Sequence, residues 1–143
     1  MHIPDGYLGP QTYWAMYAVM APLWWRAAAK VRSAVPKKNL PAYRRMAQKA
    51  GKIWREHGAL EYRECVGDDL DVKFGVSFSK TIKLKPGETV VFAYIVFRSR
   101  AHRDRVNAKV MNDPSMGAGM EDKPMPFDMK RMVYGGFKVL VDV

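Results

Sequence analysis

Residues 89–97, TVVFAYIVF, constrain the fold of this chain more than any other segment. The run is almost wholly apolar, and β-branched and aromatic side chains dominate it, which is typical of a strand. Pro86 and Gly87 precede it as a turn signal, and Ser99 follows it as a candidate helix N-cap. We therefore expect residues 89–97 to form a central strand of a sheet.

Two helices are predicted on either side of this strand. The first follows Asn39 as a candidate N-cap and ends at Gly58. Its apolar residues recur at helical spacing: Leu40, Tyr43, Met46, Ala47, Ala50, Ile53 and Trp54. The second helix covers residues 100–111 and is broken by Asp113 and Pro114.

Further strands are expected over residues 30–35, 59–66 and 131–143, and residues 72–84 are expected to form an extended connection. This order predicts an α+β fold with a ferredoxin-like β-α-β-β-α-β pattern, whose first strand is shortened or missing. A four-stranded antiparallel sheet with helices on one face leaves the other face open. Burial of that face favours a homodimer.

The composition changes near residue 31, and we divide the chain there into an N-terminal segment (1–31) and a main domain (32–143). Residues 13–29 are nearly uncharged and predict an apolar helix, with a kink at Pro22. The stretch is short for a membrane span and contains Arg26. Two alternatives remain: a segment packed on the domain, or an anchor through residues 13–31 that tethers the protein to the cytoplasmic membrane.

The formal net charge is +10, which attracts anionic partners such as nucleic acid, phospholipid or acidic small molecules. The single cysteine, Cys65, excludes an internal disulfide framework and a thiolate-rich zinc site. We therefore expect a cytoplasmic protein without a cofactor. No phosphate-binding glycine loop, HExxH or GxSxG motif is present, so enzyme activity stays an open question.

Candidate site residues fall into three groups. A carboxylate beside an imidazole could perform acid-base chemistry. The catalytic candidates are therefore His57, Glu61, Glu64 and His102. We expect these side chains to meet near the sheet, together with Cys65. The candidates for binding an aromatic or anionic ligand are Tyr43, Trp54, Tyr62, Tyr94 and Arg131. The basic face of the first helix could bind RNA or simply be solvated, and it consists of Arg44, Arg45, Lys49, Lys52 and Arg55.

Three segments of the main domain resemble the YbaA family of uncharacterised dimeric α+β barrel proteins. They are AYRRMAQKAGKIWREHGALEYRECVGDD, KPGETVVFAYIVFRSRAHRDRVNAKVMNDP and MPFDMKRMVYGGFKVLV. The resemblance implies a ferredoxin-like fold that pairs through its sheets, and it implies no established catalytic residue. Family members open with a strand of the kind YVDGF before VPK, whereas here only VPK, at residues 35–37, is present.

The opening MHIPDGYLGPQTYWAMYAVMAPLWW instead resembles the start of the CbiM family of cobalt transport proteins. That resemblance implies metal ligation by the amine of Met1 and by His2, although the other parts of a transporter are missing. A gene fusion or a truncated remnant explains the motif without any transport. The leading hypothesis for the main domain is a dimer that binds a small anionic or aromatic ligand. The alternatives are RNA binding and a membrane-tethered remnant of a cobalt transport fusion.

Overall fold

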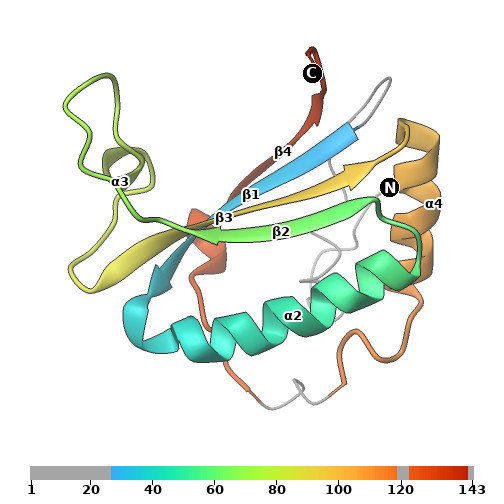
Figure 1. Cartoon of the computed structure of the whole chain (residues 1–143). Coiled ribbons are helices and arrows are strands. Elements are labelled where there is room, and N and C mark those ends of the chain that lie inside the picture. Colours follow the sequence, from blue (N-terminus) through green and yellow to red (C-terminus); the bar gives the residue numbers. More distant parts are fainter. Residues whose placement is uncertain (1–26, 119–122, 142–143) are drawn as a thin grey trace.

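An antiparallel sheet with the strand order β2-β3-β1-β4 forms the centre of the fold in a computed structural model of the chain (Figure 1). The structure describes residues 27–118 and 123–141. Its main elements follow in the order β1 (Ala27–Pro36), α2 (Leu40–Glu56), β2 (Glu61–Val66), α3 (Phe78–Thr81), β3 (Glu88–Phe97), α4 (Arg100–Met111) and β4 (Val133–Lys138). Short 3-10 turns, Lys37–Asn39 and Met129–Arg131, precede α2 and β4.

The strand β3 lies inside the sheet, as the apolar run of residues 89–97 predicts. It pairs with β1 along its whole length on one side and with β2 on the other. Val91, Ala93, Ile95 and Phe97 point into the main core, because alternate residues of a strand face the same side. The expected central strand is therefore confirmed.

Both long helices cover the same face of the sheet (Figure 1). The apolar side of α2 is buried there, and Trp54 is fully inaccessible to solvent. From α4, Val106 and Val110 join the same core. Burial of an amphipathic helix face against a half-apolar sheet is the usual source of stability in such a layered fold, and it confirms the α+β class.

The first strand is longer than the sequence predicts. A short or missing strand was expected over residues 30–35, but β1 spans ten residues, Ala27–Pro36, and crosses the proposed boundary at residue 31. Its alanines have little intrinsic strand preference, yet β3 and β4 pair with β1 on both sides, and this tertiary context decides the outcome. The predicted apolar helix is therefore wrong for residues 27–29, and residues 13–26 lie outside the described part.

Smaller differences concern the ends of elements. The last strand is limited to Val133–Lys138, and the segment expected to be extended contains the short helix α3. Ser99 caps α4 as predicted, because its hydroxyl accepts a hydrogen bond from the backbone nitrogen of His102 at 3.1 Å. Asn39 precedes α2 without capping it, and its side chain donates to the carbonyl of Pro126 at 3.1 Å instead.

The face of the sheet opposite the two helices is covered only at one end within the described residues. There the segment that contains α3 lies at the end of the sheet (Figure 1). Its Ile82, Leu70 and Leu84 pack against Val90 and Ala34. The rest of this face, which we call the open face, carries half-buried and exposed side chains, both apolar and charged: Glu61, Arg63, Cys65, Phe92, Tyr94, Val96, Val133 and Phe137. None of the described helices has the length and apolarity that crossing a membrane requires.

Candidate functional site

A groove runs between α2 and the edge strand β2, on the helix-covered side of the sheet. It encloses about 720 Å³, which is within the range of small-molecule sites. Its described lining comes from α2, β2 and one residue of β3: Leu40, Tyr43, Arg44, Ala47, Gln48, Gly51, Lys52, Arg55, Tyr62, Glu64, Val66 and Val91. The groove is therefore mainly apolar and aromatic, with a few charged groups.

A carboxyl group held by two tyrosines is the central polar feature of the groove. The hydroxyl of Tyr43 donates to Oε2 of Glu64 at 2.8 Å, and the hydroxyl of Tyr62 donates to Oε1 at 2.6 Å. Tyr43 belongs to α2, whereas Tyr62 and Glu64 are two residues apart on β2 and therefore share one side of that strand. These hydrogen bonds link the helix to the edge strand across the groove.

Burial raises the pKa of Glu64 above its usual value, although the hydrogen bonds from Tyr62 and Tyr43 act in the opposite direction. Removing a carboxylate from water disfavours its charged form, while donors to that form favour it. Desolvation is the larger effect here. A carboxyl group with a raised pKa in a groove is a candidate functional group.

Packing against α2 fixes the position of Tyr62. Its ring stacks on the indole of Trp54, with centroids 6.2 Å apart and planes inclined by 29°. The ring also lies so close to Gly51 that a Cβ there would approach Cδ1 of Tyr62 to 2.7 Å. A glycine inside a helix lowers helix stability by about 1 kcal/mol relative to alanine. The close contact with the ring explains why position 51 has a glycine nonetheless.

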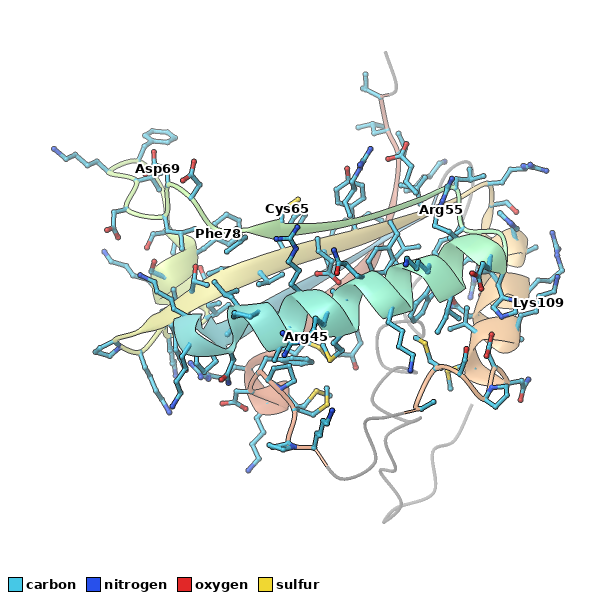
Figure 2. All side chains as sticks on the ribbon, turned by 60° about the horizontal axis from the view of Figure 1, so that its bottom comes forward. Arg45, Arg55, Cys65, Asp69, Phe78 and Lys109 are labelled. Carbon is cyan, nitrogen blue, oxygen red and sulfur yellow. The ribbon has the colours of Figure 1, made fainter. Side chains whose placement is uncertain are left out.

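Three cations of α2 line the groove: Arg44, Lys52 and Arg55. All three side chains are exposed, and Arg55 also donates to the carbonyl of Ala59 at 2.9 Å. Arg45 and Lys49, which the sequence grouped with them, do not line it. Figure 2 shows Arg45 on the side of α2 away from β2, and Lys49 donates to the carbonyl of Ala118.

The structure does not bring the four catalytic candidates together. Glu64 lies in the groove, whereas Glu61 is exposed on the open-face side of β2. Figure 2 shows Cys65 on that same side, pointing away from α2. His57 is at the far end of α2, where its Nε2 lies 2.7 Å from Oδ2 of Asp113.

Asp113 is itself held by Ser115, whose hydroxyl and backbone nitrogen both contact Oδ1. These hydrogen bonds, with the one from His57, lower the pKa of Asp113 to about 2. Nδ1 of His102 accepts a hydrogen bond from the backbone nitrogen of Arg98 at 2.9 Å. Partial burial and the nearby cation Arg98 lower the pKa of His102. Both histidines thus make contacts that fix turns and helix ends.

The remaining ligand-binding candidates are also separated. Tyr43 and Tyr62 line the groove, and Trp54 lies beneath it in the core. Tyr94 lies on the open face, 6.2 Å from Phe92 between ring centroids. Arg131 forms a two-point ion pair with Glu88 and a further hydrogen bond to Asp128, which occupies its guanidinium.

Sequence reasoning did not single out several groove residues. Several lining residues have side chains that do not by themselves predict a binding role, and only the fold places them at the groove. They are Leu40, Ala47, Gln48, Val66 and Val91. Gly51 did carry a signal, since an interior helical glycine suggests close packing. Among the described residues, no group of three histidine, cysteine or acidic side chains could hold a metal ion. Met1 and His2 lie outside the described part of the chain.

Comparison with known proteins yields two separate matches. Residues 31–129 match the family described as "Protein of unknown function (DUF1428)". The "Uncharacterized protein YbaA" of Escherichia coli K12 is 42% identical over 109 residues, which cover 76% of this chain and 92% of that protein. A protein of the same name from Shigella flexneri shows the same identity and coverage.

The second match concerns the N-terminal part. Residues 2–48 match the family described as "Cobalt uptake substrate-specific transmembrane region" (CbiM). A putative metal transport protein of Methanocaldococcus jannaschii is 45% identical over 38 residues, which cover 27% of this chain and 17% of that protein. The two family matches overlap over residues 31–48, which include part of β1 and the first half of α2.

Proposed function

This chain belongs to the DUF1428 family, whose members have no known function, and from that premise we propose that it is a small-molecule-binding protein. The groove between α2 and β2 is the binding site. The observation that carries the proposal is the combination of a concave, mainly apolar lining with a few convergent polar groups, which is the usual composition of a ligand site.

The chemistry of the lining favours a ligand with a flat apolar body and a negative charge. The rings of Tyr43 and Tyr62 offer aromatic surface, and Leu40, Ala47 and Val91 add aliphatic surface. Arg44, Lys52 and Arg55 outnumber the one acidic group of the described lining, so the groove attracts anions.

A thermal-shift screen over anionic aromatic metabolites tests the proposal, with a groove-blocking variant as its specificity control. Gln48 is exposed on α2 and lines the groove, so Gln48→Trp places an indole in it without disturbing the core. Arg45→Trp is the matched control, because Arg45 is exposed on the same helix outside the groove lining. A ligand of the groove raises the melting temperature of wild type and Arg45→Trp but not of Gln48→Trp. A screen without any hit, or hits that Gln48→Trp retains, would contradict the groove as the binding site.

We further propose that the described elements form the ferredoxin-like β-α-β-β-α-β arrangement and that two copies pair through their open faces. The supporting observation is the half-buried and exposed apolar side chains that β3 and β4 place on this face, beside the charged residues Glu61 and Arg63 of β2. Arg32 lies opposite both Phe92 and Val133 in the strand register, and Ala28 lies opposite both Val96 and Phe137. Phe137 and Val133 are about half exposed, at 50% and 48%. A second copy would bury this surface by the hydrophobic effect.

Molar mass in solution tests the pairing. We expect a dimer for wild type and a shift toward monomer for Phe137→Ser, since half of the Phe137 side chain is exposed and a second copy would bury it. Tyr134→Ser is the matched control, because Tyr134 is the alternate residue of β4 and faces the other side of the sheet. A monomeric wild type, or equal masses for the two variants, would dismiss the open-face dimer.

RNA binding is the second candidate function, favoured by exposed arginines on both sides of α2. Arg44 and Arg55 line the groove and Arg45 does not, so a phosphate backbone could follow the helix. Arg45→Gln separates the two functions: it should weaken RNA retention in a low-salt filter assay and leave a groove ligand unaffected. No retention of RNA by wild type at low salt would remove this candidate.

A further inference from the structure

One acidic side chain, Glu64, lies among the cations of the groove. In the helix, Arg44 and Lys52 are eight residues apart, or about 12 Å along the axis, and Arg55 follows one turn later. Glu64 lines the same groove from β2 and is the only acid in its described lining. An anion bound anywhere in this groove therefore experiences attraction from α2 and, when Glu64 is ionised, repulsion from β2.

The carboxyl group of Glu64 is held in place and cannot easily turn away from a ligand. Each of its oxygens accepts a hydrogen bond from one tyrosine hydroxyl, at 2.8 and 2.6 Å. One of these tyrosines, Tyr62, is itself fixed by Trp54 and Gly51. The repulsion from an ionised Glu64 can thus be removed by protonation, whereas rotation would break two hydrogen bonds.

The environment of Glu64 makes that protonation accessible. Burial raises the pKa of Glu64, as described above, and no second acid in the described lining competes for the proton. The titratable and charged groups that share the groove are Tyr43, Arg44, Lys52 and Arg55 on α2 and Tyr62 on β2, and β3 contributes only Val91. A neutral carboxyl group can donate a hydrogen bond to an anion, whereas an ionised one can only accept.

We propose that Glu64 determines the charge of the ligand: the groove takes a flat apolar compound with one anionic group, and Glu64 binds that compound in its protonated form. This inference rests on the proposed function, since it concerns the ligand of the same groove. Its consequence is that binding of an anion takes up a proton at Glu64. A neutral compound of the same shape binds without this coupling.

Two fluorescent probes of nearly identical shape test the proposal. One is 8-anilinonaphthalene-1-sulfonate, which stays anionic at all working pH values, and the other is N-phenyl-1-naphthylamine, the same molecule without the sulfonate. The dissociation constant of each is measured from pH 5 to pH 8 for wild type, Glu64→Gln and Glu61→Gln. Glu61 is the matched control, because it lies on the same strand, is exposed and points to the open face.

For wild type and Glu61→Gln, we expect the sulfonate to bind more weakly as the pH rises past the pKa of Glu64, by up to about tenfold per pH unit. The neutral probe should show no such trend. Glu64→Gln should bind the sulfonate independently of pH and more tightly than wild type at pH 8. Calorimetry in buffers with different ionisation enthalpies should detect proton uptake with wild type only.

Two outcomes overturn the inference in different ways. If the sulfonate binds in the groove but wild type and Glu64→Gln have the same pH profile, Glu64 has no role in selecting charge, and the proposed function stands. If Gln48→Trp binds both probes as tightly as Arg45→Trp does, the probes are not in the groove, and the proposed function fails together with the inference. Loss of probe binding in Phe137→Ser would then locate them on the open face.

Discussion

Arg131 and Glu88 form a two-point ion pair across 43 residues of sequence, with Nη1 at 2.7 Å from Oε2 and Nη2 at 2.5 Å from Oε1. The same guanidinium donates to Asp128 through Nε at 2.8 Å and to the carbonyl of Lys83 at 3.2 Å. This cluster joins the start of β3, the turn before β4 and the loop after α3. The cluster therefore links three segments that are separate in sequence at one end of the sheet.

Replacing Arg131 with glutamine should destabilise the fold by about 1–3 kcal/mol, because hydrogen bonds to charged groups are among the stronger ones. The hydrogen bonds from Arg131 also lower the pKa of Glu88 to about 2. A carboxylate with a lowered pKa stabilises the fold above its unfolded pKa of about 4.5, and this contribution is lost as the pH falls toward 2.

Urea unfolding of wild type and Arg131→Gln between pH 7 and pH 3 measures both effects. The difference in unfolding free energy between the two proteins should shrink on acidification. Lys130→Gln is the control, because Lys130 is exposed next to Arg131 and the change removes the same charge. Equal stabilities of Arg131→Gln and Lys130→Gln would show that the cluster contributes nothing.

This ion pair also shows what sequence reasoning could not supply. Asp128 and Arg131 are three residues apart and lie 2.8 Å from each other, and a local pair of this kind can be recognised from sequence spacing. The pairing with Glu88 depends on how β3 and the last segment meet in space, which no local pattern encodes. The separation of His57, Glu61 and His102 could not be predicted from sequence either. It depends on where the helices and strands that carry them lie in the folded chain.

More of the groove than of this ion pair could be predicted from the sequence. Helical spacing placed Tyr43 on the buried side of α2, and strand alternation placed Tyr62 and Glu64 on one side of β2. Both patterns are confirmed, yet the sequence assigned the tyrosines to ligand binding and Glu64 to catalysis. Only the packing of α2 against β2 shows that the three side chains form one hydrogen-bonded group.

Gly51→Ala should destabilise the fold although alanine is the better helix former. The substitution gains about 1 kcal/mol in helix propensity. The new Cβ, however, would lie 2.7 Å from Cδ1 of Tyr62, whose ring also stacks on Trp54, so the ring must move. Overpacking of this kind costs about 1–3 kcal/mol, and we expect a net loss of about 1 kcal/mol.

Urea unfolding followed by tryptophan fluorescence measures this change, since Trp54 stacks on the displaced ring. Gln48→Ala, an exposed substitution one turn earlier in α2, serves as the control and should change stability little. A Gly51→Ala protein more stable than wild type by the full propensity gain would show that Tyr62 is free to move.

His102 should make the fold less stable in acid. Burial and the cation Arg98 lower the pKa of His102 below its ordinary value of about 6.5, so folding favours the neutral ring. A histidine of this kind stabilises the fold above pH 6.5, and its contribution is lost as the pH falls through that value toward the lower folded pKa. The neutral ring is also the form whose Nδ1 accepts from the backbone nitrogen of Arg98.

His102→Asn tests this contribution, because an asparagine oxygen can accept a similar hydrogen bond but does not titrate. The free energy of unfolding of wild type, minus that of His102→Asn, should decrease between pH 7 and pH 5. His57→Asn provides the comparison for a histidine that is paired with a carboxylate instead. A difference that stays constant over this pH range would mean that His102 titrates alike in the folded and unfolded chains.

Glu64 should make the fold less stable as the pH rises, which is opposite to the effect of His102. This prediction can be tested without a ligand. Because burial raises its pKa, the folded chain binds a proton that the unfolded chain has already released, in the range above pH 4.5. Stability then falls as the pH rises through this range, by at most about 1.4 kcal/mol per pH unit. Above the folded pKa the carboxylate is ionised in both states, and the loss is complete.

Glu64→Gln removes this loss and keeps an amide that can bond to both tyrosine hydroxyls. Relative to wild type, the variant should therefore gain stability as the pH rises above 4.5, and the gain should level off once the pH exceeds the pKa of Glu64 in the folded chain. Glu61→Gln, whose side chain is exposed on the same strand, should show no comparable trend. Parallel pH profiles for wild type and Glu64→Gln would mean that water screens this carboxylate in the groove, and that its charge is as easily accommodated there as in the unfolded chain.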